Sequence, residues 1–283
     1  MKHLIKKGKI SILMPEGKGG GLTREVHLIE FDGIRYIVRR CSNLKKAKLY
    51  EFVSKKLEKK GFLPKFLGRD GKDVFYEYVE GRDLKRKEKL EVYYQLGKIG
   101  AYVNQVNCEY NVDLDFYKTL RELEKGNYNP SSKVLMRRKI NKIRKKPKAV
   151  LSLKRRERVL KLYKFLKREV NPEITLGISD FVPGNFRLRK GKVYLVDIES
   201  IKPKFKGSGV AKFFLKWANT SNKKRKFKEG YQSVSSLKYL TVKYEDLCYL
   251  TFIVRELWFK AQVGRNYDFD LELIDELLIK YEL

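Results

Sequence analysis

The sequence that decides the fold is Ser179-Asp-Phe-Val-Pro-Gly-Asn185, followed twelve residues later by Asp197-Ile-Glu199. Asp180 and Asn185 flank a Pro-Gly turn and Asp197 ends an apolar strand, so the three side chains can converge at one end of a hairpin. Phosphoryl transfer needs this set, because one carboxylate orients the attacking hydroxyl while an amide oxygen and a second carboxylate hold Mg²⁺. The candidate catalytic residues are therefore Asp180, Asn185 and Asp197, and the candidate metal ligands are Asn185, Asp197 and Glu199. The alternative is that all of them are ordinary turn and strand-end residues.

A glycine cluster near the N-terminus is the candidate phosphate-binding loop. It reads Gly17-Lys-Gly-Gly-Gly21 and lies between two predicted strands. Backbone amides at Gly19, Gly20 and Gly21 can approach phosphates closely because these residues carry no side chain. The cluster is not a Walker loop, since neither the Gly-Lys-Ser/Thr motif nor the start of a helix follows it. Hairpins use similar clusters, so the signal is weak when taken alone.

Arg39 and Glu51 are the next candidates for the nucleotide site. Arg39 lies in the strand after the turn at Asp32-Gly33, and Glu51 follows twelve residues later on a predicted helix. This spacing suits a cation that a helix carboxylate holds against the phosphates. We therefore expect an ion pair between Arg39 and Glu51; the alternative is that both are surface residues.

Hydrophobic periodicity divides the chain into a β-rich first part and a mainly helical remainder. Strands are expected at 10–14, 26–31, 34–38 and 75–79, with a helix from a cap at Ser42 or Asn43 to about Lys60. Further helices are expected at 90–106, 151–170 and 244–259, interrupted by a strand pair at 185–189 and 193–198 that turns at Lys190-Gly191. The fold class is α+β, with a small N-terminal lobe over 1–79 and a larger helical lobe over 80–283.

In this order, the motifs resemble the protein-kinase-like fold, closest to its aminoglycoside phosphotransferase, choline kinase and Rio kinase branches. The resemblance spans residues from about 10 to 215. It implies a bilobal kinase that uses ATP or GTP with Mg²⁺, in which Asp180 is the catalytic aspartate and Arg39 stands at the usual position of the nucleotide lysine. It also implies an adenine-reading hinge at Glu77, Tyr78 and Val79. The chain departs from the family at Ile178 and Ser179, where the catalytic loop usually has His and Gly.

Charge is the second strong signal in the sequence. The chain holds 65 Lys and Arg against 34 Asp and Glu, a net charge of +31. Residues 133–168 carry 17 basic residues and one acid, and residues 202–230 carry ten and one. Such a field favours a polyanionic partner over a cationic small molecule. Together with the kinase motifs it is similar to what is expected of archaeal tRNA kinases, which phosphorylate an internal ribose 2′-hydroxyl.

The expected function is thus phosphoryl transfer to RNA, most simply tRNA. The candidate RNA-binding residues are Arg137, Arg138, Lys145, Lys146, Arg155 and Arg156. The aromatic residues between the charges either stack on bases or, as is more common, belong to the core: Tyr163, Phe165, Phe205, Phe213, Phe214 and Trp217. Two alternatives stay open, a small-molecule or Rio-like protein kinase and a catalytically silent RNA-binding protein.

Other classes of protein are disfavoured by the composition. No uncharged apolar run approaches the roughly 18 residues of a membrane span. The three cysteines (Cys41, Cys108 and Cys248) show neither metal-ligand spacing nor a disulfide pattern, and two histidines cannot complete a zinc site with them. We therefore expect a soluble cytoplasmic protein without a structural metal.

Overall fold

The computed structural model describes residues 11–13, 26–85, 87–126, 149–236 and 241–283. The chain forms two compact units, each built from several segments. The first unit contains residues 1–106, 180–201 and 220–235, and the second contains the remainder. The lobe boundary expected after Val79 stays a prediction. Within the described residues, no helix is both long enough and apolar enough to cross a membrane.

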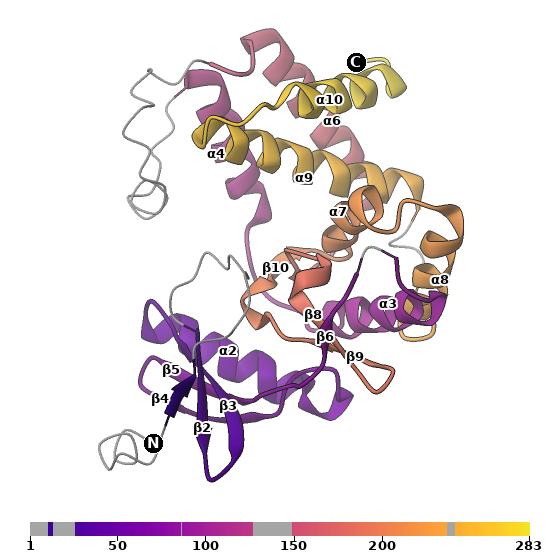
Figure 1. Cartoon of the computed structure of the whole chain (residues 1–283). Helices are drawn as coiled ribbons and strands as arrows, with labels where there is room; N and C mark the ends of the chain where they lie inside the picture. The colour runs from indigo at the N-terminus through magenta and orange to yellow at the C-terminus, as the bar shows by residue number, and fades with distance from the viewer. Residues whose placement is uncertain (1–10, 14–25, 86, 127–148, 237–240) are drawn as a thin grey trace. The chain divides into compact units, whose positions relative to one another are not determined.

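A five-stranded antiparallel sheet forms the first layer of the first unit (Figure 1). Its strands lie in the order β1-β2-β3-β5-β4, and the turn between β2 and β3 has positive φ at Asp32 and Gly33, as the Asp-Gly signal predicts. Arg39 lies on the central strand β3, opposite Val26 on one side and Val74 on the other. The strands are β1 (Ser11–Leu13), β2 (Val26–Phe31), β3 (Ile34–Arg40), β4 (Phe66–Asp70) and β5 (Asp73–Glu77).

Helix α2 (Leu44–Leu57) packs against β4 and β5 of this sheet. The Asn43 side chain caps it by accepting a hydrogen bond from the Lys46 amide at 2.9 Å, which confirms one of the two predicted caps. Its buried face holds Ala47, Tyr50, Val53 and Leu57, at the spacing of an amphipathic helix. After Leu57 the chain tightens into a 3₁₀ turn, so the α-helix ends three residues before Lys60.

The predicted second hairpin is confirmed as β8 (Phe186–Arg189) and β9 (Lys192–Leu195), with positive φ at Lys190 and Gly191. The short strand β6 (Arg82–Asp83) pairs with β8. The expected second strand ends at Leu195 rather than Ile198, because a 3₁₀ turn over Ile198–Ser200 begins directly after Asp197. This turn fixes the position of the Asp-x-Glu motif.

Helices α3 (Leu90–Asn104) and α8 (Ser221–Gln232) pack closely in the same unit. Glycines let the two backbones approach. A Cβ atom on Gly97 would lie 2.1 Å from the Phe227 carbonyl oxygen, and one on Gly230 would lie 1.9 Å from the Tyr94 carbonyl oxygen. Each is far inside van der Waals contact, so these positions require glycine.

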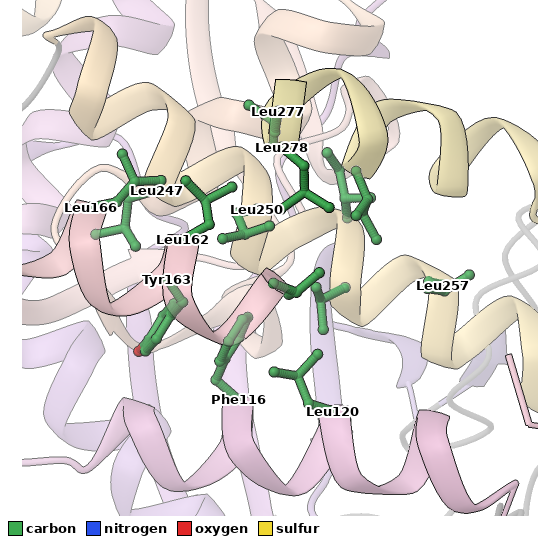
Figure 2. Packing of buried hydrophobic residues seen from close by; sticks show 14 of the residues in the cluster. Phe116, Leu120, Leu162, Tyr163, Leu166, Leu247, Leu250, Leu257, Leu277 and Leu278 are labelled. Atoms are coloured by element: carbon green, nitrogen blue, oxygen red, sulfur yellow. The ribbon is translucent and has the colours of Figure 1, made fainter. Parts of the chain in front are cut away.

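The second unit is built around a helical core (Figure 2). Phe116 of α4 stacks on Tyr163 of α6 with ring centroids 3.9 Å apart, and leucines of α9 and α10 complete the cluster. Tyr163, Phe205, Phe213 and Phe214 are buried, which confirms that these aromatic residues belong to the core. The elements are α4 (Val112–Lys125), α6 (Leu153–Val170), β7 (Ile174–Ile178), β10 (Ile201–Phe205), α7 (Ser208–Lys216), α9 (Val242–Gln262) and α10 (Asp268–Lys280).

Several of these elements were not predicted. β4 and β10 are short and contain charged residues together with glycine or proline, whereas β7 is short and apolar. β4 pairs with the adjacent β5, and β7 pairs with β10, from which it is separated in the sequence by the β8–β9 hairpin. Helices α4, α7, α8 and α10 were also missed. The predicted strand over 75–79 runs instead from Asp73 to Glu77.

Candidate active site

Backbone hydrogen bonds hold the loop from Asp180 to Asn185 in a compact turn. The Val182 amide donates to the Asp180 carbonyl at 3.0 Å, and the Asn185 amide donates to the Val182 carbonyl at 3.0 Å. The Asn185 side-chain nitrogen also donates to the Asp180 carbonyl, at 2.7 Å. Because its nitrogen is occupied in this way, the Asn185 amide presents its oxygen as the remaining acceptor.

The loop is joined to the Asp-x-Glu motif by the Val196 amide, which donates to the Asn185 carbonyl at 2.9 Å. The Asp197 carbonyl in turn accepts from the Ser200 amide at 3.1 Å and from the Ser200 hydroxyl at 2.7 Å. The first unit therefore brings the three predicted catalytic residues together in one hydrogen-bonded frame.

Two cations meet the carboxylates of this motif. Arg39 donates to Glu199 Oε2 through Nη1 at 2.7 Å and lies 3.3 Å from Asp197 Oδ1 through Nη2. Lys46, in the first turn of α2, donates to the other oxygen of Glu199. The Arg39 side chain is only 13% exposed. The result is a compact cluster of two cations and two carboxylates, in which Arg39 connects the sheet to the Asp-x-Glu motif.

The electrostatics of the cluster depend on burial. Burial raises the pKa of the Asp197 carboxyl, and the nearby Glu199 and Asp180 raise it further, whereas Arg39 lowers it. Burial and Glu199 likewise raise the pKa of the Tyr50 hydroxyl, which makes no hydrogen bond to any described residue. The site thus holds the buried Asp197 carboxylate, whose charge Arg39 stabilises. Beside it lies the buried Tyr50 hydroxyl, which has no acceptor among the described residues.

The predicted ion pair between Arg39 and Glu51 is wrong for this structure. Glu51 accepts instead from Arg69 of β4 at 2.6 Å and from Lys55 at 2.8 Å, and these two cations lower its pKa to about 2. The reason is helical phase, since one residue rotates the side chain by about 100°. Tyr50 and Lys46, one turn apart, are directed to the site, whereas Glu51 is turned toward β4.

The predicted hinge is only partly available to a nucleotide. The Glu77 amide donates to the Lys65 carbonyl at 3.0 Å, and the Tyr78 amide donates to the Arg35 carbonyl at 3.2 Å. In the described part of the chain, no carbonyl accepts from the Val79 amide. Of the three hinge amides, the one at Val79 is therefore free to bind a base.

Other predicted site residues lie elsewhere. Arg155 donates to both oxygens of Asp275, and Arg156 donates to Glu124, so carboxylates of the second unit already hold both side chains. The remaining candidates lie outside the described residues and keep the status of predictions: Gly19, Gly20, Gly21, Arg137, Arg138, Lys145 and Lys146.

The donor set of Asn185, Asp197 and Glu199 fits a hard divalent cation, because it offers one amide oxygen and two carboxylates. Among the described residues, no group of three His, Cys, Asp or Glu side chains forms a metal cluster. Arg39 and Lys46 neutralise the two carboxylates. The free Tyr50 hydroxyl and the oxygen of Asn185 add polar groups that a metal–nucleotide complex would satisfy.

Comparison with known proteins supports the fold. No family model matches the chain, and no curated protein matches its sequence. Among solved structures, the chain is similar to a choline kinase from Streptococcus pneumoniae, with a TM-score of 0.62 and 17% identity over 98% of this chain and 99% of the other. It is also similar to a spectinomycin phosphotransferase in complex with ADP and spectinomycin, with a TM-score of 0.61 and 12% identity over 99% and 98%.

A third similar structure is an amicoumacin kinase in complex with AMP-PNP, Ca²⁺ and Ami, with a TM-score of 0.57 and 14% identity over 99% of this chain and 92% of the other. All three matches cover nearly the whole of both chains. The α+β protein-kinase-like fold expected from the motifs is confirmed: the chain has the fold that these kinases and phosphotransferases share.

Proposed function

We propose that this protein is an ATP- and Mg²⁺-dependent phosphotransferase whose acceptor is a ribose 2′-hydroxyl of RNA, most simply of tRNA. One observation carries the phosphotransferase part: Arg39 from the central strand is bound to both carboxylates of the Asp-x-Glu motif, next to the turn that holds Asp180 and Asn185. A cation for the phosphates, carboxylates for the metal and a further aspartate for the hydroxyl are the parts that phosphoryl transfer requires.

In this proposal, nucleotide binding exchanges the partners of the charge cluster. Arg39 and Lys46 would contact the phosphates instead of the carboxylates. Asp197 and Glu199, together with the Asn185 amide oxygen, would then be available to hold Mg²⁺. The exchange keeps every charge compensated, which matters because an uncompensated buried charge is costly. Bound Mg²⁺ would neutralise phosphate charge and orient the transferred group.

Asp180 would orient the acceptor hydroxyl and accept its proton. The three backbone and side-chain hydrogen bonds around its loop keep the backbone of Asp180 fixed relative to Asn185. Such positioning lowers the entropic cost of bringing hydroxyl and phosphate together. Of the three predicted hinge amides, that of Val79 is the one available to donate a hydrogen bond to the base.

The acceptor is inferred from charge. A net charge of +31 opposes binding of a cationic small molecule and favours a polyanion. RNA also supplies the acceptor alcohol, since each ribose carries a 2′-hydroxyl that DNA lacks. The alternative is a small-molecule acceptor, favoured by the names of the similar structures, which include a choline kinase and a spectinomycin phosphotransferase.

The test is transfer of label from γ-³²P-ATP to total tRNA, followed by nuclease digestion and identification of the labelled nucleotide. We expect a ribose-phosphorylated nucleotide with the natural chain and none with Asp180→Asn. Label entering choline or an aminoglycoside, with none in tRNA and with kinetics insensitive to salt, would show that the alternative is correct.

A further inference from the structure

A basic pocket of about 260 Å³ lies between α4 and α6, entirely within the second unit. Three cations and three less polar side chains line it: Arg121, Arg156, Lys164, Tyr117, Leu120 and Leu160. The pocket is smaller than the roughly 300–1,000 Å³ typical of sites for drug-sized ligands. Its volume suits one nucleotide unit better than a whole cofactor.

Two of the three cations have no carboxylate partner among the described residues. Arg156 donates to Glu124, but Arg121 and Lys164 make no hydrogen bond or ion pair with any residue that the structure describes. Both are exposed at the pocket. The pocket therefore offers two available positive charges beside a third that Glu124 holds in place.

The less polar part of the lining provides a surface for a flat ring. Tyr117 is 37% exposed, and its ring packs edge-on against the buried Tyr163 at a centroid distance of 5.9 Å. Leu120 is fixed in the core, where Figure 2 shows it on the same helix as Phe116. Because Tyr163 packs against it, the partly exposed Tyr117 ring is already held in position before a ligand binds.

We propose that this pocket binds one nucleotide of the RNA acceptor, with its phosphate held by Arg121 and Lys164 and its base against Tyr117 and the two leucines. This inference rests on the proposed function. Phosphate contacts from Arg and Lys together with base–aromatic stacking are the usual means of holding single-stranded RNA. In the sequence, the segment that joins the two helices adds nine Lys and Arg residues between 133 and 148, which favours a polyanion over a small anion.

The test is fluorescence anisotropy of the full chain with end-labelled total tRNA, between 50 and 300 mM KCl. The variant Arg121→Gln with Lys164→Gln removes the two free cations. We expect its log–log salt slope to flatten by about 0.7–0.9, the value for one phosphate contact. We expect the affinity for tRNA at low salt to fall about tenfold. The loss should be similar for RNAs of different sequence, because a phosphate contact does not read the bases.

A matched control is Lys118→Gln with Lys161→Gln, which removes two exposed lysines from the same two helices but outside the pocket lining. We expect a change in slope below half of that seen for the pocket variant. Tyr117→Leu tests the base contact separately. It should weaken tRNA binding by about 5- to 100-fold, as loss of one stacked base does, and leave the salt slope unchanged.

The outcomes separate the pocket from the proposed function. If the natural chain transfers label to tRNA but the pocket and control variants bind tRNA alike, the pocket assignment is wrong and the kinase proposal stands. If the natural chain does not bind tRNA, the pocket assignment is wrong as well. If uridine monophosphate binds in a way that depends on Arg121 and Lys164 while tRNA affinity is unaffected, the pocket serves a small phosphorylated ligand instead.

Discussion

Two groups of positive charge, one in each unit of this protein, differ in whether a carboxylate compensates them. In the first unit, Arg39 and Lys46 are bound to Asp197 and Glu199 in a compact, compensated cluster. In the second unit, Arg121 and Lys164 line a pocket without a carboxylate partner in the described residues. In the proposed function, the paired cations exchange their carboxylates for phosphates when the nucleotide binds, whereas the cations of the pocket bind the RNA. Net charge alone does not reveal this difference.

The largest effect is expected from substitution of the two aspartates that the proposal assigns to phosphoryl transfer. Asp180→Ala should lower kcat by about 10²–10⁴-fold, the usual contribution of a positioned acid or base, while nucleotide affinity is kept. Asp197→Ala should lower it at least as much, because the metal loses a carboxylate ligand. Turnover is measured by label transfer from ATP. Near-normal turnover in both variants would show that the catalytic site does not lie at Asp180 and Asp197.

A second prediction concerns the cations of the paired cluster. Arg39→Met and Lys46→Met should each weaken binding of a fluorescent ATP analogue by about 10- to 100-fold, since a charge-assisted hydrogen bond contributes about 1.5–3 kcal/mol. Lys55→Met, on the same helix but paired with Glu51, is the control and should bind normally. If Glu51→Gln weakens binding of the ATP analogue as much as Lys46→Met does, the result would support an Arg39–Glu51 pair, which this structure does not contain.

Lys204 of β10 is a third kind of cation, partly buried and without an ion-pair partner among the described residues. Burial, together with the nearby charges of Arg255 and Lys202, lowers its pKa to about 7. Between about pH 7 and the ordinary lysine value of about 10.4, the unfolded chain binds a proton that the folded chain does not. The free energy of unfolding should therefore rise with pH across this window.

Replacement of this lysine should remove the effect. In urea titrations, Lys204→Met should flatten the pH dependence and raise stability near pH 6 by on the order of 1–2 kcal/mol, because a charge no longer has to be buried. Lys118→Met, at an exposed position of the same unit, should leave the pH dependence as it is. An unchanged slope for Lys204→Met would show that this lysine is solvated in the folded state.

The smallest effect is expected at Arg155 and Arg156. Because Asp275 and Glu124 already hold them, Arg155→Gln should change the salt slope of tRNA binding by less than the roughly 0.7 per phosphate contact. It should cost a few tenths of a kcal/mol to about 1 kcal/mol of stability, the usual range for a partly exposed ion pair. A full phosphate-sized change in slope would mean that RNA displaces Asp275.

The backbone frame of the candidate site could be predicted from the sequence because its signals are local. The Asp-Gly and Lys-Gly turns, the Asn43 cap and the spacing of Asp180, Asn185 and Asp197 each depend on neighbouring residues. Helix α4 had such a signal as well, since Asn111 caps it and Phe116, Leu120 and Leu123 form its buried face. The acidic residues of its first turn, Asp113 and Asp115, also favour the start of a helix.

Pairings between distant segments could not be predicted in this way. Glu199 is bound by Arg39 and by Lys46, both more than 150 residues earlier in the sequence. Whether Lys46 or Glu51 of α2 reaches the site depends on which face of the helix meets it. One clue was present: Lys46 extends the buried stripe of Tyr50 and Val53 by one turn, whereas Glu51 is off that stripe. β7 pairs with β10, and the two strands are separated in the sequence by the β8–β9 hairpin. The sequence of β10 contains two lysines and a proline, which weaken its strand signal.

The most direct test of the account is a steady-state comparison of two variants in the transfer of label from ATP to tRNA. Lys46→Met should raise the KM for ATP and leave the KM for tRNA unchanged. Arg121→Gln with Lys164→Gln should do the reverse, because it removes cations only from the α4–α6 pocket. If both variants raise the same KM, the two groups of charge do not serve different substrates, and the contrast between the units does not describe the function.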